Sequence, residues 1–276
     1  MTGPLSVLMA VHGGERPEYL SAALESIFIQ TLTPREVVLV EDGPLGKTLR
    51  AVIKAWSARQ PALLRSVRLE SNMGLAEALN AGLKACTCEL VARMDSDDVS
   101  LGDRFERQAR FFAENEDIDV LGGYSDERDA SLGHTIAIRK VPSRHEDIAA
   151  LIKWKNPMNH VTVMFRKEAV ESAGGYPPEL RKMQDYGLWA KMIKAGCRFA
   201  NLPEVLVTFR AGEDFIRRRG GIGYFRYDIA VMRYLKKTGV VGNLHFAANL
   251  VLRFLSRISP PRLRNLIYSE IRRREK

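Results

Sequence analysis

The chain has 276 residues, of which 46% are hydrophobic, so it can bury the core of one large α/β domain with an appendage and is not globally disordered. The three cysteines are an odd number, and the pair in Cys86-Thr-Cys88 fits neither a disulfide framework nor a zinc knuckle, so a reducing compartment is expected. Residues 1–11 lack the basic start and cleavage site of a signal peptide, and no apolar run approaches the length of a membrane span. We therefore expect a cytoplasmic protein.

The net charge of +9 is unevenly distributed along the chain. Residues 217–276 contain 15 Lys and Arg against 3 Asp and Glu, whereas residues 1–216 contain 27 Lys and Arg against 30 Asp and Glu. This asymmetry predicts a nearly neutral catalytic domain at 1–216 and a basic C-terminal tail at 217–276. It argues against a nucleic-acid-binding domain, which would carry a basic face of its own.

Up to residue 98, apolar runs alternate with helical stretches. Helices are predicted at 17–30 and 75–85, because leucines recur on one face of each, and a further helix begins near Leu101. Alternation of this kind indicates a parallel sheet with right-handed crossovers, as in a nucleotide-binding α/β fold. The predicted strands are 5–11, 37–41, 67–70 and 90–94.

After residue 112 the alternation weakens and the chain is predicted to be a mixed α/β region. Helices are expected at 144–154 and 185–195, the second closed by Gly196. The short strands expected here are 118–121, 135–141, 161–165 and 205–209.

Beyond Gly221 the chain is expected to be helical, with two apolar stripes separated by the Pro260-Pro261 pair. The second stripe, within residues 263–271, is flanked by arginines. Basic amphipathic helices suit an anionic membrane surface, and the alternative is a helical cap docked on the domain with its basic face in solvent. The first stripe consists of Phe246, Leu250, Phe254, Leu255 and Ile258.

Polar side chains follow all four predicted strands of the first half. Because the carboxyl ends of parallel strands meet at one edge of a sheet, we expect these groups to form one pocket. Carboxylates this close raise each other's pKa unless a cation neutralises them, and a hard divalent ion is their natural partner. The alternative for the last group is capping of the following helix. The groups are Glu15, Asp42, Asn72, and the cluster Asp95, Asp97 and Asp98.

Five motifs occur in a fixed order along the chain. They are Val40-Glu-Asp-Gly43, Asn72-Met-Gly-Leu-Ala-Glu-Ala-Leu-Asn-Ala-Gly82, Met94-Asp-Ser-Asp-Asp98 with Asp103-Arg-Phe-Glu-Arg-Gln108, Asn156-Pro-Met-Asn-His160, and Gly174-Gly-Tyr176 ahead of Gln184-Asp-Tyr-Gly-Leu-Trp189. Together they resemble the inverting family 2 glycosyltransferases over most of residues 5–210. The resemblance implies the GT-A fold, a Rossmann-like, mostly parallel sheet flanked by helices.

The resemblance implies that the donor is a nucleotide diphosphate sugar, with UDP as the expected nucleotide. By the same comparison, Asp42 accepts a hydrogen bond from the uracil ring, and Val11 and Asn72 line the base pocket. Mn²⁺ or Mg²⁺ is implied as the cofactor that bridges the diphosphate. The full set of implied nucleotide-sugar-binding residues is Val11, Glu15, Asp42, Asn72, Asp95 and Ser96.

The metal ligands and the base are implied in the same way. Asp95 and Asp97 correspond to the acidic pair that holds the metal ion, and Asp98 is expected to cap the following helix. Asp185 resembles the general base that takes the proton of the acceptor hydroxyl, although the family most often has Glu where this chain has Gln184. The alternative for Asp185 is a first-turn acid that stabilises its helix.

Other polar residues keep two interpretations. His160 is either a satisfied core residue or a metal ligand, and the third protein ligand is unassigned. Arg210 and the arginines at 217–219 either contact a diphosphate or form a solvated face. If Asp185 is not the base, Glu213 and Asp214 are the next candidates.

These features predict an inverting glycosyltransferase that adds one sugar, since the Gln-x-x-Arg-Trp signature of processive synthases is absent. The expected acceptor is a saccharide or a lipid-diphosphate-linked sugar in bacterial surface polysaccharide synthesis, at the inner face of the plasma membrane. A sugar-nucleotidyltransferase would need a glycine-rich loop with Arg and Lys after the first strand, which residues 12–16 supply poorly. The other alternative is a catalytically inactive module that binds nucleotide sugars.

Overall fold

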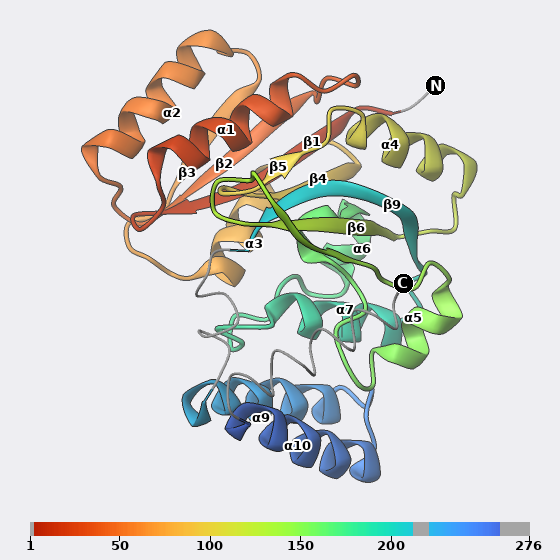
Figure 1. The fold of residues 1–276 in the computed structure, drawn as a ribbon. Helices are drawn as coiled ribbons and strands as arrows, with labels where there is room; N and C mark the ends of the chain where they lie inside the picture. Colours follow the sequence, from red (N-terminus) through yellow and green to blue (C-terminus); the bar gives the residue numbers. More distant parts are fainter. Residues whose placement is uncertain (1–2, 212–220, 260–276) are drawn as a thin grey trace.

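A nine-stranded sheet organises residues 3–211 and 221–259, the part of the chain that the computed structural model describes (Figure 1). Its strand order is β3-β2-β1-β4-β8-β6-β9-β5, and β7 pairs with β6 beside this path. The strands are β1 Leu5–His12, β2 Glu36–Asp42, β3 Leu64–Arg68, β4 Leu90–Asp95, β5 Val99–Ser100, β6 Val120–Arg128, β7 Thr135–Arg139, β8 Met164–Arg166 and β9 Phe199–Arg210.

Helices pack against both faces of the sheet. In β2, Val37 and Leu39 are buried with residues of α1, α2 and α4, whereas Val38 and Val40 are buried with residues of α3, α7 and α9. This alternation follows from the period of two in a strand and defines a doubly covered sheet. The helices are α1 Pro17–Phe28, α2 Lys47–Arg59, α3 Leu75–Ala85, α4 Arg104–Glu114, α5 His145–Leu151, α6 Lys167–Ser172, α7 Gln184–Lys194, α9 Ile222–Lys237 and α10 Asn243–Ile258, with a 3₁₀ turn, η1, at His160–Thr162.

The parallel arrangement predicted for the first half is confirmed, because β1 pairs in parallel with β2 and β4, and β2 with β3. β3 lies slightly before its predicted position, since it is an edge strand with only Leu64 buried. The apolar pattern did not indicate α2, in which only Leu49, Ile53 and Trp56 are buried. The carboxyl ends of β1, β2 and β4 therefore meet at one edge of the sheet, as expected for the polar groups that follow these strands.

β6 and β9 are much longer than their apolar cores suggest. Together they form a long parallel ladder from Val120↔Phe199 to Arg128↔Arg210. Polar residues in the second half of β6 are buried, among them Asp126 and Glu127, so the strand lacks the hydrophobic pattern of a core strand. This ladder brings the end of β9 beside β5 and the carboxylate cluster.

The motif at residues 103–108 has a structural role. The guanidinium of Arg104 is fully buried and donates to the carbonyls of Arg93 and Val163, at 2.8 and 3.2 Å. The Gln108 amide donates to the carbonyls of Leu121 and Thr162, at 3.1 and 2.9 Å. Buried charges persist only when they are hydrogen-bonded, so these bonds fix β4, β6 and η1 to α4.

Helices α9 and α10 pack beside each other below α7, at the end of the molecule away from α1 and α2 (Figure 1). Val231, Met232 and Leu235 of α9 are fully buried in the same core as Trp189 of α7. The helices expected beyond Gly221 are thus present. The expected domain boundary at 216/217, the Pro260-Pro261 break and the stripe within 263–271 lie outside the described residues.

Across residues 3–211 and 221–259, no helix combines the length and the hydropathy that a membrane crossing needs.

Candidate active site

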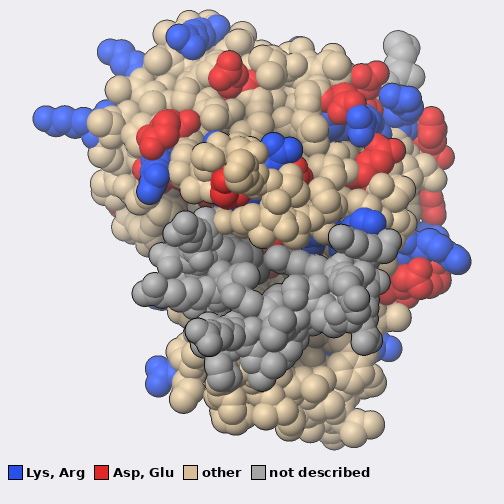
Figure 2. Space-filling view, viewed as in Figure 1, with Lys and Arg blue, Asp and Glu red and all other residues tan. Residues whose placement is uncertain are grey.

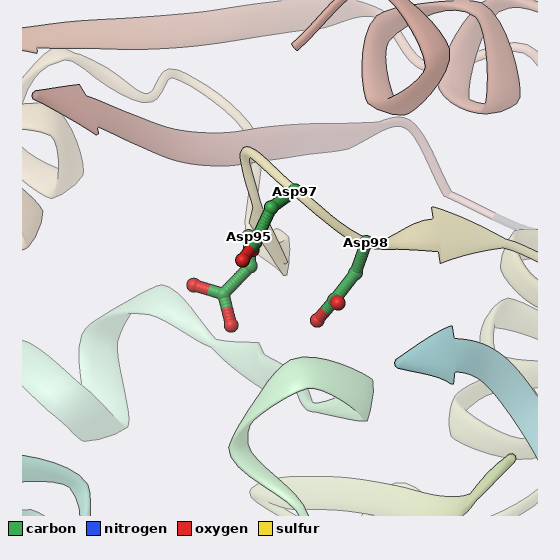
Figure 3. Close-up of side chains that lie close together, drawn as sticks. All are labelled: Asp95, Asp97 and Asp98. Atoms are coloured by element: carbon green, nitrogen blue, oxygen red, sulfur yellow. The ribbon is translucent and has the colours of Figure 1, made fainter. Parts of the chain in front are cut away.

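Three carboxylates converge in the loop that joins β4 to β5. Asp95 ends β4, Asp97 and Asp98 follow, and all three side chains point to the same side of the loop (Figure 3). One ligand oxygen from each residue lies within 4.8 Å of the others. The cluster predicted from the sequence is therefore assembled in the fold.

Asp98 does not cap a helix, which corrects the expectation for this residue. Helix α4 begins only at Arg104, and Asp98 instead accepts a hydrogen bond from the backbone N–H of Arg210 in β9, at 2.9 Å. Its other oxygen, Oδ2, is buried without a hydrogen-bond partner among the described residues. Burial and the neighbouring carboxylates of Asp95 and Asp97 raise the pKa of Asp98 well above its usual value.

The carboxylate cluster has the chemistry of a divalent cation site. Burial raises the pKa of Asp97 to about 7, and the carboxylates of Asp95 and Glu15 add to the shift. The unpartnered oxygen of Asp98 and the mutual repulsion of the group are what a hard cation with oxygen ligands would relieve. Within the described residues, the donor set therefore fits Mn²⁺ or Mg²⁺.

A buried arginine beneath the cluster offsets part of its charge. Arg93 lies two residues before Asp95 on β4, so both side chains are on the same face of the sheet. Its guanidinium, only 2% exposed, forms an ion pair with both oxygens of Asp95. Sequence reasoning assigned Arg93 no role, although the two-residue spacing was a usable signal.

The residues expected to bind the base lie at the ends of β2 and β3. The Asp42 carboxylate accepts hydrogen bonds from the N–H groups of Met73 and Gly74, at 2.7 and 3.1 Å, ahead of α3. The Asn72 amide is 3.5 Å from the carbonyl of Asp42. Gly43 has φ of +85°, and a Cβ there would lie 2.5 Å from the Asn72 nitrogen, so only glycine fits this close approach.

The other expected nucleotide-sugar residues are placed as follows. The Ser96 hydroxyl donates to the Glu15 carboxylate at 2.7 Å, which joins the β1 end to the carboxylate loop. The Val11 side chain is 1% exposed and packs in the core, so its backbone is the part left to face a ligand. Their roles stay predictions.

Asp95 and Asp185 line one cavity of about 560 Å³, bounded by residues of β4, β6, η1, α7, α9 and α10. Asp185 is in the first turn of α7, directly after Met183, a non-glycine residue with φ of 62°. Backbone strain of this kind is tolerated where it aims a functional group. The fold thus brings the predicted metal ligand and the predicted base to one space.

The Asp185 carboxylate is held in place by Asn156, whose amide donates to Oδ2 at 2.6 Å. Burial raises the pKa of Asp185, and the bonds from the Tyr186 N–H and from Asn156, together with nearby Arg93, oppose that shift. Asn156 was part of a recognised motif, but its contact with Asp185 became apparent only in the fold.

His160 also lines the cavity, and its Nε2 is 3.0 Å from the hydroxyl of Tyr176. Burial lowers the pKa of His160 well below its usual value, so the ring is neutral. The imidazole therefore has a partner within the core, as in the first of its two interpretations. Arg210 donates to the carbonyl of Asp97 at 2.6 Å, and the arginines at 217–219, with Glu213 and Asp214, lie outside the described residues.

Comparison with known proteins identifies the family. The family model "Glycosyl transferase family 2" matches residues 6–174. The chain is 38% identical to the amylovoran biosynthesis glycosyltransferase AmsE of Erwinia amylovora over 272 residues, which cover 97% of this chain and 99% of AmsE. It is 36% identical to the Escherichia coli UDP-Gal:alpha-D-GlcNAc-diphosphoundecaprenol beta-1,3-galactosyltransferase over 273 residues, which cover 99% of this chain and 98% of that enzyme.

Among solved structures, the mannosyltransferase PcManGT from Pyrobaculum calidifontis, in complex with GDP-Man and Mn²⁺, superposes with a TM-score of 0.65 at 18% identity, over 94% of this chain and 71% of that one. This chain belongs to glycosyl transferase family 2 and is a glycosyltransferase with the GT-A fold. The resemblance found in the sequence is thereby confirmed.

Proposed function

We propose that this protein transfers one sugar, with inversion, from a UDP-sugar to a lipid-diphosphate-linked sugar during bacterial surface polysaccharide synthesis. The observation that carries the proposal is the shared cavity of Asp95 and Asp185, which joins a carboxylate cluster to a half-buried carboxylate held in place by Asn156. The donor and acceptor classes are supported by the E. coli relative, whose name specifies UDP-Gal and a diphosphoundecaprenol acceptor.

In the proposed mechanism, Asp95 and Asp97 hold Mn²⁺ or Mg²⁺, which supplies Lewis-acid stabilisation of the leaving diphosphate when it is bound. Asp42 and Asn72 orient the uracil ring of the donor at the ends of β2 and β3. Asp185, fixed by Asn156, takes the proton of the acceptor hydroxyl as that oxygen attacks the anomeric carbon. One base suffices for inversion, because attack and departure occur on opposite faces of the sugar.

A donor screen tests this proposal. Thermal unfolding is measured with UDP-galactose, UDP-N-acetylglucosamine and GDP-mannose, each with and without Mn²⁺. We expect a UDP-sugar to raise Tm only with Mn²⁺, because the metal is proposed to hold the diphosphate. A ligand present at 100 times its Kd stabilises the folded protein by roughly 2.7 kcal/mol, so the shift is measurable. A larger shift with GDP-mannose would contradict the UDP assignment. An assay of sugar transfer to the acceptor distinguishes the proposed transferase from a sugar-nucleotidyltransferase and from an inactive binding module, because neither of these two would transfer the sugar.

The proposed membrane association is supported by the outer surface of α9 and α10. α10 contains no acidic residue, and its two charged residues, Arg253 and Arg257, are turned toward the protein. Figure 2 shows the surface over these helices, at the bottom of the view, as mainly tan with blue at its edges. The large apolar side chains exposed on α10 are Leu244, Val251, Leu252, Phe254, Leu255 and Ile258, with exposures of 41–80%.

Exposed basic residues also lie on α9, the helix that packs against α10. Arg226, Arg233, Lys236 and Lys237 are exposed, and the single acidic residue of α9, Asp228, is fully buried. An apolar stripe beside exposed cations is what an anionic lipid surface binds, through burial of apolar area and attraction of about 1 kcal/mol per basic residue. We therefore propose that the outer surface of α9 and α10 lies on the inner face of the membrane.

We expect Leu255→Glu to lower partitioning to phosphatidylglycerol vesicles by roughly tenfold, because it removes an apolar contact and adds a like charge. Sedimentation of the full-length protein with vesicles measures this. Ile29→Glu, on a residue at the end of α1 that is 68% exposed against 52% for Leu255, is the matched control and should bind as wild type. Equal binding of Leu255→Glu and wild type would exclude α10 as the lipid contact.

A further inference from the structure

Gln184 is the residue directly before the proposed base, and the proposed mechanism assigns it no role. It is the first residue of α7, preceded by Met183 with its positive φ and followed by Asp185. Gln184 and Asp185 both line the cavity of about 560 Å³. The question is therefore what the Gln184 side chain can bind in that space.

The Gln184 side chain is packed in place, yet its amide is free. The residue is only 7% exposed, so most of its side chain lies against the protein. Within the part of the chain that the structure describes, the amide forms no hydrogen bond with another residue, whereas the Asn156 amide donates to Asp185. Because Gln184 lines the cavity and its amide oxygen and nitrogen are not enclosed by the protein, both atoms are available to a ligand there.

The backbone that carries Gln184 is fixed by close packing. The N–H of Gly187 donates to the carbonyl of Met183 at 3.1 Å and closes the first turn of α7. A Cβ at Gly187 would lie 2.6 Å from Leu180 Cδ1 and 2.9 Å from Pro177 Cγ, so this turn packs against the preceding segment without space for a side chain. A ligand therefore meets an amide whose position is already restricted, which reduces the entropy lost on binding.

The proposed reaction brings sugar rings to this end of α7. A positioned base lies roughly 2.6–3.2 Å from the oxygen whose proton it takes, and the reacting atoms are held roughly 3–3.5 Å apart. The acceptor hydroxyl and the anomeric carbon of the donor must therefore both come close to Asp185. The residues expected to contact the uracil and the diphosphate are instead at the ends of β2, β3 and β4. A cavity-lining side chain next to the base is thus placed to meet a sugar ring rather than the nucleotide.

The amide of Gln184 suits an uncharged group of a sugar. It offers one acceptor oxygen and two N–H donors, which match a hydroxyl or an acetamido group, because each of these both donates and accepts. An ionised carboxylate at this position could only accept, and its charge would raise the pKa of Asp185 by repulsion. Glutamine therefore provides a sugar contact without a second negative charge beside the base.

We infer that Gln184 is a specificity-determining residue whose amide binds a hydroxyl or acetamido group of a sugar ring in the cavity. The inference rests on the proposed function and adds a sugar contact to it. The ring belongs to the donor or to the acceptor, since both carry such groups and both meet at Asp185. A bound ring excludes water from the amide, so a sugar without the matching group leaves the amide unpaired and binds more weakly. The contact thus selects among sugars that differ at one position.

The test combines Gln184→Met in the full-length protein with substrates that lack one polar group. Methionine has a similar length and no amide, and Gln60→Met, at the end of α2 and outside the cavity lining, is the matched control. UDP, UDP-galactose and UDP-N-acetylglucosamine are titrated calorimetrically with Mn²⁺ present. The KM of an alkyl N-acetylglucosaminyl diphosphate acceptor is measured in parallel. Monodeoxy analogues of each sugar then identify the group that contacts Gln184.

We expect Gln184→Met to weaken binding of one sugar substrate by roughly tenfold, the contribution of about one hydrogen bond, and to leave the affinity for UDP unchanged. The analogue that lacks the contacted group should bind wild type and Gln184→Met equally, because the hydrogen bond is then absent from both. Weaker binding of the UDP-sugar assigns the contact to the donor, and a raised KM for the acceptor assigns it to the acceptor. Gln60→Met should behave as wild type throughout.

Thermal unfolding separates this role from a structural one. Gln184→Met removes no hydrogen bond between described residues, so Tm without ligand should stay near that of wild type. The inference is overturned if Gln184→Met binds the UDP-sugars and uses the acceptor normally, if it weakens UDP equally, if it weakens every analogue as much as the parent sugar, or if Tm and activity fall together. Failure of the proposed function appears in the wild type instead, as the absence of hydrolysis and transfer of any nucleotide sugar, and the inference then falls with it.

Discussion

Asp185→Asn is expected to lower turnover by roughly 10²- to 10⁴-fold, the usual contribution of a positioned general base, and to leave the affinity for UDP with Mn²⁺ near that of wild type. The asparagine keeps the shape of the side chain but cannot accept the proton of the acceptor hydroxyl. Donor affinity should persist because Asp185 is on α7, whereas the residues expected to contact the metal and the uracil are at the ends of β2, β3 and β4. Steady-state kinetics and calorimetric titration of UDP measure the two quantities.

The pH profile gives an independent check of the same residue. Burial raises the pKa of the Asp185 carboxyl above its ordinary value of 3.8 and outweighs the groups that lower it, which are the Tyr186 N–H, Asn156, Arg93 and Arg139. A base works only when deprotonated. At saturating Mn²⁺, where bound metal keeps the ligand Asp97 deprotonated, turnover of the wild type should therefore fall as the pH falls through this raised pKa, and that acid limb should be missing from the residual activity of Asp185→Asn.

Asn156→Ala separates orientation from proton transfer at this position. It removes the 2.6 Å bond to Asp185 without removing the carboxylate, so turnover should fall less than in Asp185→Asn, with the acid limb moved to higher pH because a bond that stabilised the charged form is gone. If Asp185→Asn transfers sugar at nearly the wild-type rate, or loses UDP binding together with activity, the base must be another residue.

The first half of the site could be predicted because its geometry follows from topology. Once residues 1–98 are recognised as alternating strands and helices, the ends of the strands must meet at one edge, so Asp42 and Asp95 are brought near one another without knowledge of any contact. The position of Arg93 beside Asp95 could also have been predicted, because residues two apart on a strand lie on the same face. The signal was present in the sequence and was not used.

The second half could not be predicted in the same way. The cavity depends on how α9 and α10 dock on α7, and docking is set by side-chain packing rather than by strand order. Arg253 and Arg257 follow Asn249 at four-residue spacing, a polar stripe that ordinarily indicates a solvated face. In the fold Arg253 and Arg257 are turned inward onto Asp228, and apolar residues of α10 such as Val251 and Leu255 are left exposed, the reverse of the usual orientation.

The cap expected at Asp98 shows a further limit of local rules. Asp, Ser and Asp before a helical pattern are good capping residues, and the sequence offers no reason to prefer a strand there. The two-residue strand β5 intervenes because Val99 and Ser100 pair with Val207 and Thr208 of β9, more than 100 residues later. A contact that distant in sequence has no local signature, so Asp98 could be assigned only in the fold.

Asp97→Ala is expected to lower Mn²⁺-dependent affinity for UDP by at least roughly 100-fold, since loss of groups that merely orient a metal ligand already costs about 10- to 100-fold. The fold should persist. Removing one carboxylate relieves its repulsion with Asp95 and Glu15, so Tm in metal-free buffer should equal or exceed that of wild type. Calorimetric titration with UDP at fixed Mn²⁺, beside thermal unfolding, measures both effects.

The matched control for this prediction is Asp117→Ala, which removes an exposed carboxylate paired with Arg198 far from the β4–β5 loop. It should change neither UDP affinity nor its dependence on Mn²⁺. Because Asp97 is proposed as a ligand and not as the base, its loss must act through the metal, so raising the Mn²⁺ concentration should partly restore UDP binding and turnover. Unchanged UDP affinity in Asp97→Ala, or a loss that Mn²⁺ does not relieve, would remove Asp97 from the metal site and leave Asp95 and Asp98 as its candidate ligands.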